Sequence, residues 1–271
     1  MLDVIGYVEA EKAKLKEEVA KRTEQLGKPP RLVIISDKEN FGSNQSYIKS
    51  KQRFASEVGI DCEVVYAEAF EDINLDFNEV DGVIMQYPFA HYDFDLFQEI
   101  VTGMIPPHLD VDGLGNGSHW HPCTPLGIVR YIEHLRENKV IDKDNVTVNV
   151  VGYGGLVGKP LVEMLMEQRD YTVCVTRSGT DSWVSDNFEA SADVVVCATP
   201  KHDLIKFPDL HKVYVDCGCN LVNGKLLGNV SRSAYTEEAL ITPVPGGVGR
   251  LTVLSLYKNV FESYKRHFVK P

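Results

Sequence analysis

Tyr47 and Lys51 are the first residues along the chain whose types and spacing could support chemistry. They lie four residues apart in SNQSYIKSKQRFASEVGI, a segment whose pattern predicts a helix, so their side chains would share one helix face. A phenol held beside an ammonium group could orient it and shield it from water for acid or base catalysis. A lysine that snorkels over an aromatic ring is the more ordinary interpretation of such a pair, and spacing alone favours it.

A glycine-rich turn is the second candidate. In VTVNVVGYGGLVGKPLVEML, a strand pattern is followed by glycines at 152, 154, 155 and 158 and then by a helix pattern. Such a turn lets the backbone approach a pyrophosphate, whose charge the N-terminus of the helix would offset. The spacing departs from the stricter dinucleotide fingerprint, so a tight turn without a ligand is the alternative, but the flanking strand and helix favour a dinucleotide.

The strand that follows this helix ends at Thr176 and leads into Arg177 and Ser178. Folds that bind NAD usually place an acidic residue at this point, where it binds the 2′-hydroxyl of the ribose. A cation and a hydroxyl suit a 2′-phosphate instead, so the sequence favours NADP. The alternative is an arginine that is merely solvated in a loop.

Other polar residues stand at loop positions. Gln86 follows the strand pattern of DGVIM, at the carboxyl end, where α/β proteins bind ligands. Asp110 and Asp112 lie in IPPHLDVDGLG, a loop bounded by proline and glycine, where a turn residue is the default interpretation. His119 and His121 have no adjacent carboxylate, so a loop pair is favoured over a metal site.

An α/β fold would position these residues. Short β-branched runs alternate with helical patterns, which predicts parallel βαβ units. Asn223-Gly224 between apolar residues predicts a hairpin. The expected strands are 31–36, 62–67, 82–87, 146–151, 171–176, 193–199 and 212–217, and helices are expected at the N-terminus, over about 43–58 and 125–137, after the glycines and along the tail.

The net charge, the apolar runs and the cysteines exclude several classes of protein. The formal net charge is −11, which argues against nucleic acid as a partner because binding phosphates needs clustered cations. No apolar run is long enough to span a membrane, and the N-terminus lacks the pattern of a signal sequence, so we expect a soluble, cytoplasmic protein. The cysteines in strand-like runs, Cys174, Cys197, Cys217 and Cys219, are expected to be buried thiols rather than metal ligands.

Taken together, these segments resemble the bifunctional methylenetetrahydrofolate dehydrogenase/methenyltetrahydrofolate cyclohydrolase family. The resemblance runs in the same order over nearly the whole chain. Its most specific segment is TPVPGGVGRLTV, and the others are SYIKSKQRFASEVGI, DGVIMQYPF, IPPHLDVDGLG, HPCTPLGIV, VVGYGGLVGKPL, ADVVVCATPK and VDCGCN with GKLLGNV. It implies oxidation of 5,10-methylenetetrahydrofolate with NADP, hydrolysis of the methenyl product to 10-formyltetrahydrofolate, and a place in purine biosynthesis.

The resemblance also implies a role for each candidate residue. Lys51 would handle the proton of the cyclohydrolase step, positioned by Tyr47 and held by Gln86, and Asp112 would bind the N–H edge of the pterin. The folate would further contact Pro245, Gly246 and Gly247. The dinucleotide would contact Gly152, Tyr153, Gly154, Gly155, Val157, Gly158, Arg177, Ser178, Thr199 and Thr252.

Two departures from the family pattern bear on ligand choice. Tyr153 and Gly154 stand where the family usually has Arg-Ser, and that arginine often binds the 2′-phosphate, so NAD remains an alternative to NADP. Arg250 replaces a small or apolar residue after PGGVG and could meet the glutamate tail of the substrate.

The expected architecture is α/β with two domains and a ligand cleft between them. A folate-binding domain would span residues 1–122 and be completed by a C-terminal helix at 251–271, and a Rossmann-like domain would span 123–250. The hairpin of the resembled family pairs across a two-fold axis, which implies a homodimer. Two alternatives stay open: a dehydrogenase of the same architecture without cyclohydrolase activity, and a non-catalytic dinucleotide sensor.

Overall fold

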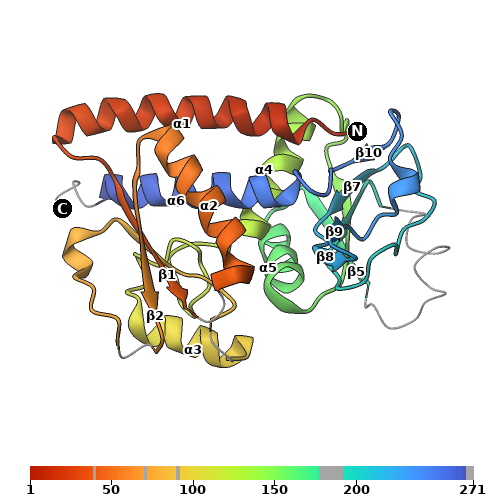
Figure 1. Ribbon diagram of the computed structural model, residues 1–271. Helices are drawn as coiled ribbons and strands as arrows, with labels where there is room; N and C mark the ends of the chain where they lie inside the picture. Colours follow the sequence, from red (N-terminus) through yellow and green to blue (C-terminus); the bar gives the residue numbers. More distant parts are fainter. Residues whose placement is uncertain (39–40, 70–71, 90–91, 177–191, 267–271) are drawn as a thin grey trace. The chain divides into compact units, whose positions relative to one another are not determined.

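The chain folds as two compact units. The computed structural model describes residues 1–38, 41–69, 72–89, 92–176 and 192–266 (Figure 1). The first unit comprises residues 9–123 and 253–271, and the second comprises residues 1–8 and 124–252. Both units are built from parallel strands and helices, which confirms the α/β class.

The first unit is organised around a three-stranded parallel sheet in the order β2-β1-β3. The central strand reads RLVIISD and is buried at all but its first residue, because both of its faces are covered. The strands are β1 (Arg31–Asp37), β2 (Asp61–Ala67) and β3 (Gly82–Met85). The helices wholly or mostly in this unit are α1 (Val4–Leu26), α2 (Phe41–Val58), the 3-10 helix η2 (Phe77–Glu79), α3 (Phe94–Met104) and α6 (Val248–Arg266).

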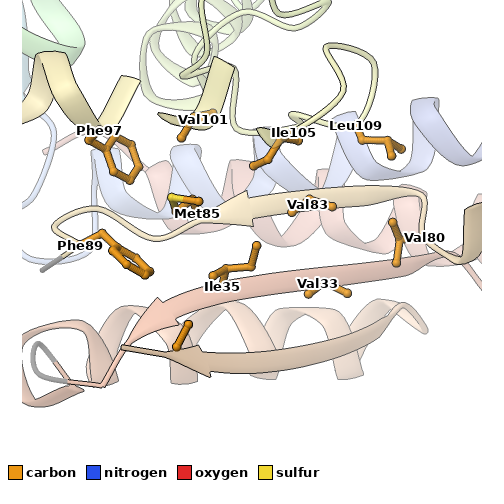
Figure 2. Packing of buried hydrophobic residues seen from close by; sticks show 11 residues of the cluster. Val33, Ile35, Val80, Val83, Met85, Phe89, Phe97, Val101, Ile105 and Leu109 are labelled. Carbon is orange, nitrogen blue, oxygen red and sulfur yellow. The ribbon is translucent and has the colours of Figure 1, made fainter. Parts of the chain in front are cut away.

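The core of the first unit fills the space between the sheet and α3 (Figure 2). Alternate residues of β1 and β3 point to this side, among them Val33, Ile35 and Met85, and they meet Phe97 and Val101 of α3. Helices α1, α2 and α6 lie on the opposite side of the sheet from α3 (Figure 1). The sheet is therefore sandwiched between helices, and only its edges and strand ends are left for polar residues.

The second unit has a five-stranded parallel sheet in the order β10-β7-β6-β4-β5. The chain leaves β4 for β5 on one side and then continues to β6 on the other side of β4. This reversal creates a topological switch point at the carboxyl ends of β4 and β6, where α/β sheets bind ligands. The elements are α4 (Cys123–Glu137), β4 (Val146–Val151), α5 (Gly155–Met166), β5 (Tyr171–Thr176), β6 (Val194–Cys197), β7 (Val213–Asp216), the 3-10 helix η3 (Arg232–Ala234) and β10 (Leu240–Ile241).

A separate antiparallel hairpin, β8 (Asn220–Val222) with β9 (Lys225–Leu227), follows β7. Its turn residues Asn223 and Gly224 have φ values of 49° and 74°, and positive φ at both central positions is what a two-residue hairpin turn needs. The prediction of a hairpin from Asn-Gly is confirmed.

The first eight residues belong to the second unit, whereas the sequence assigned them to the folate-binding domain. The N–H of Leu2 donates to Ile241 O at 3.2 Å, and the ring of Tyr7 lies 5.2 Å from that of Tyr131, centroid to centroid. Helix α1 runs through this boundary without a break in its pattern. The sequence therefore held no local signal for the change of unit.

All seven expected strands form, with ends that shift by two residues at most. Sequence reasoning missed β10, since two residues are too few to show a pattern. It also missed α3, although Asp93 is a helix N-cap whose side chain accepts from the N–H of Leu96.

Among the helices that the structure describes, none combines the length and apolar character required to cross a lipid bilayer.

The packing of the first unit's core predicts different effects on stability for two adjacent residues of α3. Phe97 is fully buried, whereas the neighbouring Leu96 is 42% exposed. We expect Phe97→Ala to lower the free energy of unfolding by about 3–5 kcal/mol, because it leaves a cavity under the sheet. Leu96→Ala should change it by no more than about 0.5 kcal/mol. Urea unfolding followed by circular dichroism measures both, and equal losses would contradict the assignment of Phe97 to the core.

Candidate functional site

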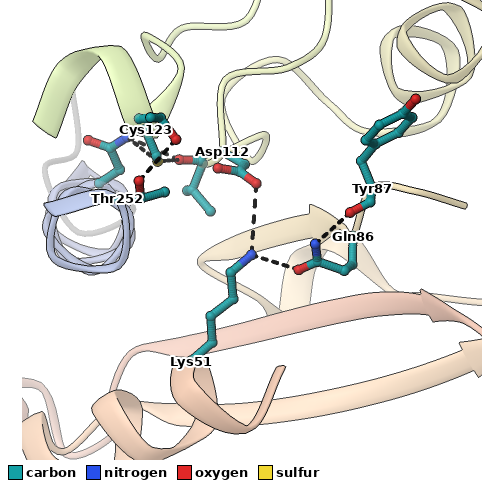
Figure 3. A network of polar contacts seen from close by, with 9 residues as sticks. Lys51, Gln86, Tyr87, Asp112, Cys123 and Thr252 are labelled. Atoms are coloured by element: carbon teal, nitrogen blue, oxygen red, sulfur yellow. Dashed lines mark hydrogen bonds and ion pairs between the residues drawn. The ribbon is translucent and has the colours of Figure 1, made fainter. Parts of the chain in front are cut away.

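The side chain of Lys51 is held in a largely buried polar site in the first unit (Figure 3). Only 8% of this side chain is exposed. Its ammonium donates to Gln86 Oε1 at 2.9 Å and lies 4.0 Å from Asp112 Oδ2. The amide of Gln86 donates in turn to the carbonyl oxygen of Tyr87 at 2.8 Å, which fixes the amide so that its oxygen faces the ammonium.

The fold brings these three residues together from separate parts of the chain. Lys51 lies on α2, which follows β1. Gln86 comes directly after β3, and its N–H donates to Ile35 O at 2.8 Å, so the β1–β3 ladder runs one residue beyond the strand. Asp112 comes from the loop after α3. All three therefore gather at the carboxyl edge of the sheet, where parallel α/β sheets place their ligands.

The loop that carries Asp112 is fixed by two local features. Asp110 is buried, bridges to β3 at Val83, and accepts from the N–H of Gly115 at 2.8 Å. Burial raises the pKa of the Asp110 carboxyl. Gly113 has φ 72°, and a Cβ there would stand 2.6 Å from the main chain of His121, so only glycine fits. Asp110 is thus a structural residue, whereas Asp112 points to Lys51.

The 4.0 Å between Lys51 and Asp112 is longer than a hydrogen bond, although it is short enough for a strong charge interaction in a site with little solvent. The carboxylate therefore balances the buried ammonium and keeps the capacity to accept from a further donor. A group with paired N–H donors is the natural complement of such a carboxylate.

Tyr47 lies one helical turn before Lys51 on α2, and 49% of it is exposed. A snorkelling lysine would keep its ammonium in water. Lys51 instead has its ammonium inside the site, bound to Gln86. The ordinary interpretation that spacing favoured for this pair is therefore wrong for Lys51.

A pocket of about 730 Å³ lies at the switch point of the second unit, which is a volume typical of sites for small molecules and cofactors. Loops after β4, β6 and β7 form its walls. The lining residues are Gly152, Tyr153, Gly154, Gly155, Leu156, Val157, Ala198, Thr199, Pro200, Cys217, Cys219 and Asn220.

The glycines of the first loop fit the close approach of a pyrophosphate. Gly152 has φ 97°, and a Cβ at this position would collide with Ala198 O. A Cβ at Gly158 would collide with Gly152 O, so α5 packs directly onto the turn. Gly154 is the N-cap of α5 and supplies no side-chain cap, which leaves the first N–H groups of the helix for water or an anion.

A buried carboxylate that sequence reasoning missed holds the other walls of the pocket. Asp216, at the end of β7, accepts from the N–H groups of Gly218, Asn229 and Val230 at 2.8 to 2.9 Å. Burial raises the pKa of Asp216, and these donors oppose that rise. The side chain of Asn229 then donates to both oxygens of Thr199 at 2.9 Å. The only sequence signal was an acidic residue after an apolar strand.

The remaining residues predicted to contact the ligands either do not line this pocket or fall outside the described residues. Thr252 lies on α6, bonded to Thr124 at 3.0 Å between hydroxyl oxygens, and does not line the pocket. The 245–247 segment begins with a cis peptide bond before Pro245, and Gly246 has φ 105°. Arg177 and Ser178 fall outside the described residues.

Two of the cysteines contradict the expectation of buried thiols. Cys174 is exposed because β5 is an edge strand, and Cys219 is exposed because it lies beyond the end of β7, in the pocket wall. Cys197 is buried, as expected for a residue of the inner strand β6, and Cys217, directly after the end of β7, is half-buried in the pocket wall. In the part of the chain that the structure describes, no three metal-binding side chains cluster.

Comparison with known proteins gives consistent matches over both units. A family model described as "Tetrahydrofolate dehydrogenase/cyclohydrolase, catalytic domain" matches residues 6–112. A second, described as "Tetrahydrofolate dehydrogenase/cyclohydrolase, NAD(P)-binding domain", matches residues 122–268. The bifunctional protein FolD of Halothermothrix orenii is 34% identical, with 94% of each chain covered.

Solved structures agree with these matches. The bifunctional enzyme FolD of Campylobacter jejuni, a methylenetetrahydrofolate dehydrogenase/cyclohydrolase, is 27% identical, with 97% of each chain covered and a TM-score of 0.78. The bifunctional 5,10-methylenetetrahydrofolate dehydrogenase/cyclohydrolase of Thermoplasma acidophilum is 26% identical, with coverage of 95% of this chain and 97% of that one and a TM-score of 0.74.

The glycine turn makes a prediction that needs no ligand. Gly158→Ala should lower the free energy of unfolding by about 1–3 kcal/mol, because α5 must move away from the turn. Gly103→Ala is the control, since nothing lies within 4 Å of its Cβ and it also replaces glycine by alanine inside a helix, α3, where alanine is the better helix former. Thermal unfolding of the two variants, followed by circular dichroism, tests this. A Gly158→Ala protein as stable as the control would contradict the close packing.

Proposed function

The chain belongs to the tetrahydrofolate dehydrogenase/cyclohydrolase family, and from this premise we propose that it oxidises 5,10-methylenetetrahydrofolate with NADP and hydrolyses the methenyl product to 10-formyltetrahydrofolate. The observation that carries this proposal is the buried ammonium of Lys51, held by Gln86 and facing Asp112. We assign folate binding to the first unit, residues 9–123 with 253–271, and dinucleotide binding to the second unit, residues 1–8 with 124–252.

The dehydrogenase step depends on the second unit. A nicotinamide dinucleotide supplies the hydride acceptor. The turn from Gly152 to Gly158 would hold its pyrophosphate, because the glycines leave room and the N-terminus of α5 offsets the charge. Tyr153, Val157 and Thr199 would line the rest of the pocket. The proposed contribution of the chain is to place the dinucleotide, not to take part in the hydride transfer.

NADP is proposed over NAD on the sequence that follows β5. Arg177 and Ser178 offer a cation and a hydroxyl for the 2′-phosphate, and no acidic residue stands beside them. Tyr153 replaces the arginine that the family usually has, so one cation is lost and the preference should be modest. Thr252 is proposed as a further contact with the dinucleotide.

The cyclohydrolase step depends on the first unit. Water adds to the methenyl carbon, the bond from that carbon to N5 breaks, and N10 keeps the formyl group. The Lys51 ammonium would donate a proton to N5 as that bond breaks, and the amine so formed would take one proton of the added water, whose other proton passes to solvent. Gln86 would keep the Lys51 Nζ in place. Asp112 would accept from the amino and ring N–H groups of the pterin with the acceptor capacity that its ion pair leaves.

The outer parts of the folate are assigned to other residues. Tyr47, exposed on the same helix as Lys51, would orient the substrate and the lysine. Pro245, Gly246 and Gly247 would contact the folate through a segment that has little side chain to obstruct it. The same family resemblance supports a cytoplasmic enzyme of purine biosynthesis that acts as a homodimer.

Lys51→Met tests the proposed role of the lysine. It should reduce hydrolysis of methenyltetrahydrofolate by about 10²–10⁴-fold, the range that a proton-transfer group contributes. Binding of NADP, measured by isothermal titration calorimetry, should be unchanged. Lys49→Met is the control, because Lys49 lies on the same helix and is exposed. Near-normal hydrolysis by Lys51→Met would rule out this role.

The wild-type assay decides among the functional alternatives. Methylenetetrahydrofolate is supplied with NADP or NAD separately, and absorbance reports the reduced dinucleotide and the methenyl product. Oxidation without hydrolysis would indicate a dehydrogenase that lacks the second activity. Dinucleotide binding without turnover would indicate a sensor.

The homodimer is proposed from the hairpin. Among the described strands, β8 and β9 pair only with each other, and Leu221 on β8 is 76% exposed. Such an edge invites pairing with a second copy. Light scattering at micromolar concentration should give twice the mass of the chain, and Leu221→Lys should shift it toward the monomer. Met166→Lys, at an equally exposed site on α5, should not. A wild-type monomer would contradict the proposal.

A further inference from the structure

Tyr257 on α6 binds the main chain of Lys51. It is fully buried, and its hydroxyl donates to Lys51 O at 2.7 Å. Its ring stacks on Phe54, three residues further along α2, with centroids 5.0 Å apart and planes inclined by 11°. Burial raises the pKa of Tyr257 well above its usual range, so the phenol stays protonated and able to donate. One side chain thus fixes the turn of α2 that carries Lys51.

The same part of α6 holds the main chain beside Asp112. Asn259 is 2% exposed, and its side-chain amide donates to Val111 O at 3.0 Å. The thiol of Cys123 donates to the same oxygen at 3.2 Å. Val111 directly precedes Asp112, so the base of this carboxylate is held from two sides.

Tyr257 and Asn259 reach different neighbours because residues two apart on a helix point about 200° away from each other. Tyr257 therefore faces α2, and Asn259 faces the loop after α3. Both residues lie in the part of α6 that belongs to the first unit, together with Lys51 and Asp112. A single rigid element is thus the common support of the two opposite charges in the site.

We propose that Tyr257 and Asn259 are positioning residues that set the 4.0 Å separation between the Lys51 ammonium and the Asp112 carboxylate. The inference rests on the proposed function of these two charges. A substrate bound by Asp112 must present its reacting carbon to Lys51, so the separation of the two groups decides whether the bound geometry is productive. A misplacement of about 1 Å in such a site can cost on the order of 10²-fold in rate.

Gln86 alone cannot fulfil this function. It binds the ammonium at the end of a long flexible side chain, which would swing if its helix moved. Tyr257 acts at the other end, on the backbone of Lys51. Fixing both ends leaves the four-carbon stem between them little rotamer freedom.

Tyr257→Phe is the decisive variant, since it removes the hydroxyl and keeps the ring that stacks on Phe54. Tyr264→Phe is its matched control. Tyr264 lies on the same helix, is also fully buried, and its hydroxyl also donates to a lysine main chain, Lys28 O, at 2.7 Å. Both variants lose a buried hydrogen bond, so both midpoints of thermal unfolding should fall by a few degrees, about 2–4 °C.

Only Tyr257→Phe should affect the chemistry. We expect its kcat for hydrolysis of methenyltetrahydrofolate to fall about 10-fold with KM nearly unchanged, because the lysine is displaced and the pterin contact is kept. Its pH–rate profile should also change shape, whereas the Tyr264→Phe profile should match the wild type. Equal kinetics in the two variants would overturn the proposal.

Asn259→Leu tests the other support. It should raise KM more than it lowers kcat, because it loosens the residue that binds the pterin. If the Asn259→Leu protein does not fold, the comparison of the kinetics of Tyr257→Phe with those of Tyr264→Phe tests the proposal by itself.

A structural measurement, which does not depend on catalytic activity, tests the positioning role separately from the proposed function. Crystal structures of the wild type and both tyrosine variants should show a changed Nζ–Oδ2 separation in Tyr257→Phe alone. An unchanged separation would refute the positioning role even in an active enzyme. A wild type that does not hydrolyse methenyltetrahydrofolate would refute the function and leave this measurement valid.

Discussion

The burial of the Lys51 ammonium is the constraint around which the first unit is arranged. Removing an ammonium group from water costs several kcal/mol unless other groups replace its hydration. Here an amide from the end of β3 and a carboxylate from the loop after α3 provide that replacement. Neither residue is near Lys51 in the sequence, so the parallel sheet, the glycine turn under Asp112 and the contacts of α6 are all needed to bring them within reach.

The second unit has the opposite kind of buried charge. Asp216 also lies at the carboxyl edge of a parallel sheet, but main-chain N–H groups occupy its oxygens at hydrogen-bonding distance. A carboxylate so fully bonded has no capacity left for a ligand, and its effect is to fix the walls of the pocket. Asp112, at 4.0 Å from its cation, keeps that capacity. A carboxylate whose oxygens already accept hydrogen bonds from the main chain is structural, whereas one that keeps acceptor capacity is suited to bind a substrate.

Local sequence patterns predicted much of this structure. Continuous apolar runs located the strands, Asn223-Gly224 located the hairpin, and the glycines after β4 located the pocket. The family, inferred from segments in their order, is confirmed by both family models.

What the sequence could not supply are relations between distant segments. Nothing near Tyr257 signals that its hydroxyl reaches Lys51, 206 positions away. The exposure of Cys174 depends on β5 lying at the sheet edge, which is a matter of strand order. Even Lys51 looked like a surface lysine from its spacing to Tyr47, because its buried partners come from other elements.

The division of the chain has a consequence for biosynthesis. The first unit is made of two segments, residues 9–123 and 253–271, and the whole central part of the second unit is translated between them. At about 5–20 residues per second, the ribosome takes on the order of ten seconds to pass from one segment to the other. During that interval the nascent sheet of the first unit lacks α6, and with it Tyr257 and Asn259. The unit whose sheet is synthesised first thus completes its fold only at the end of translation, and chaperones would meet its uncovered face.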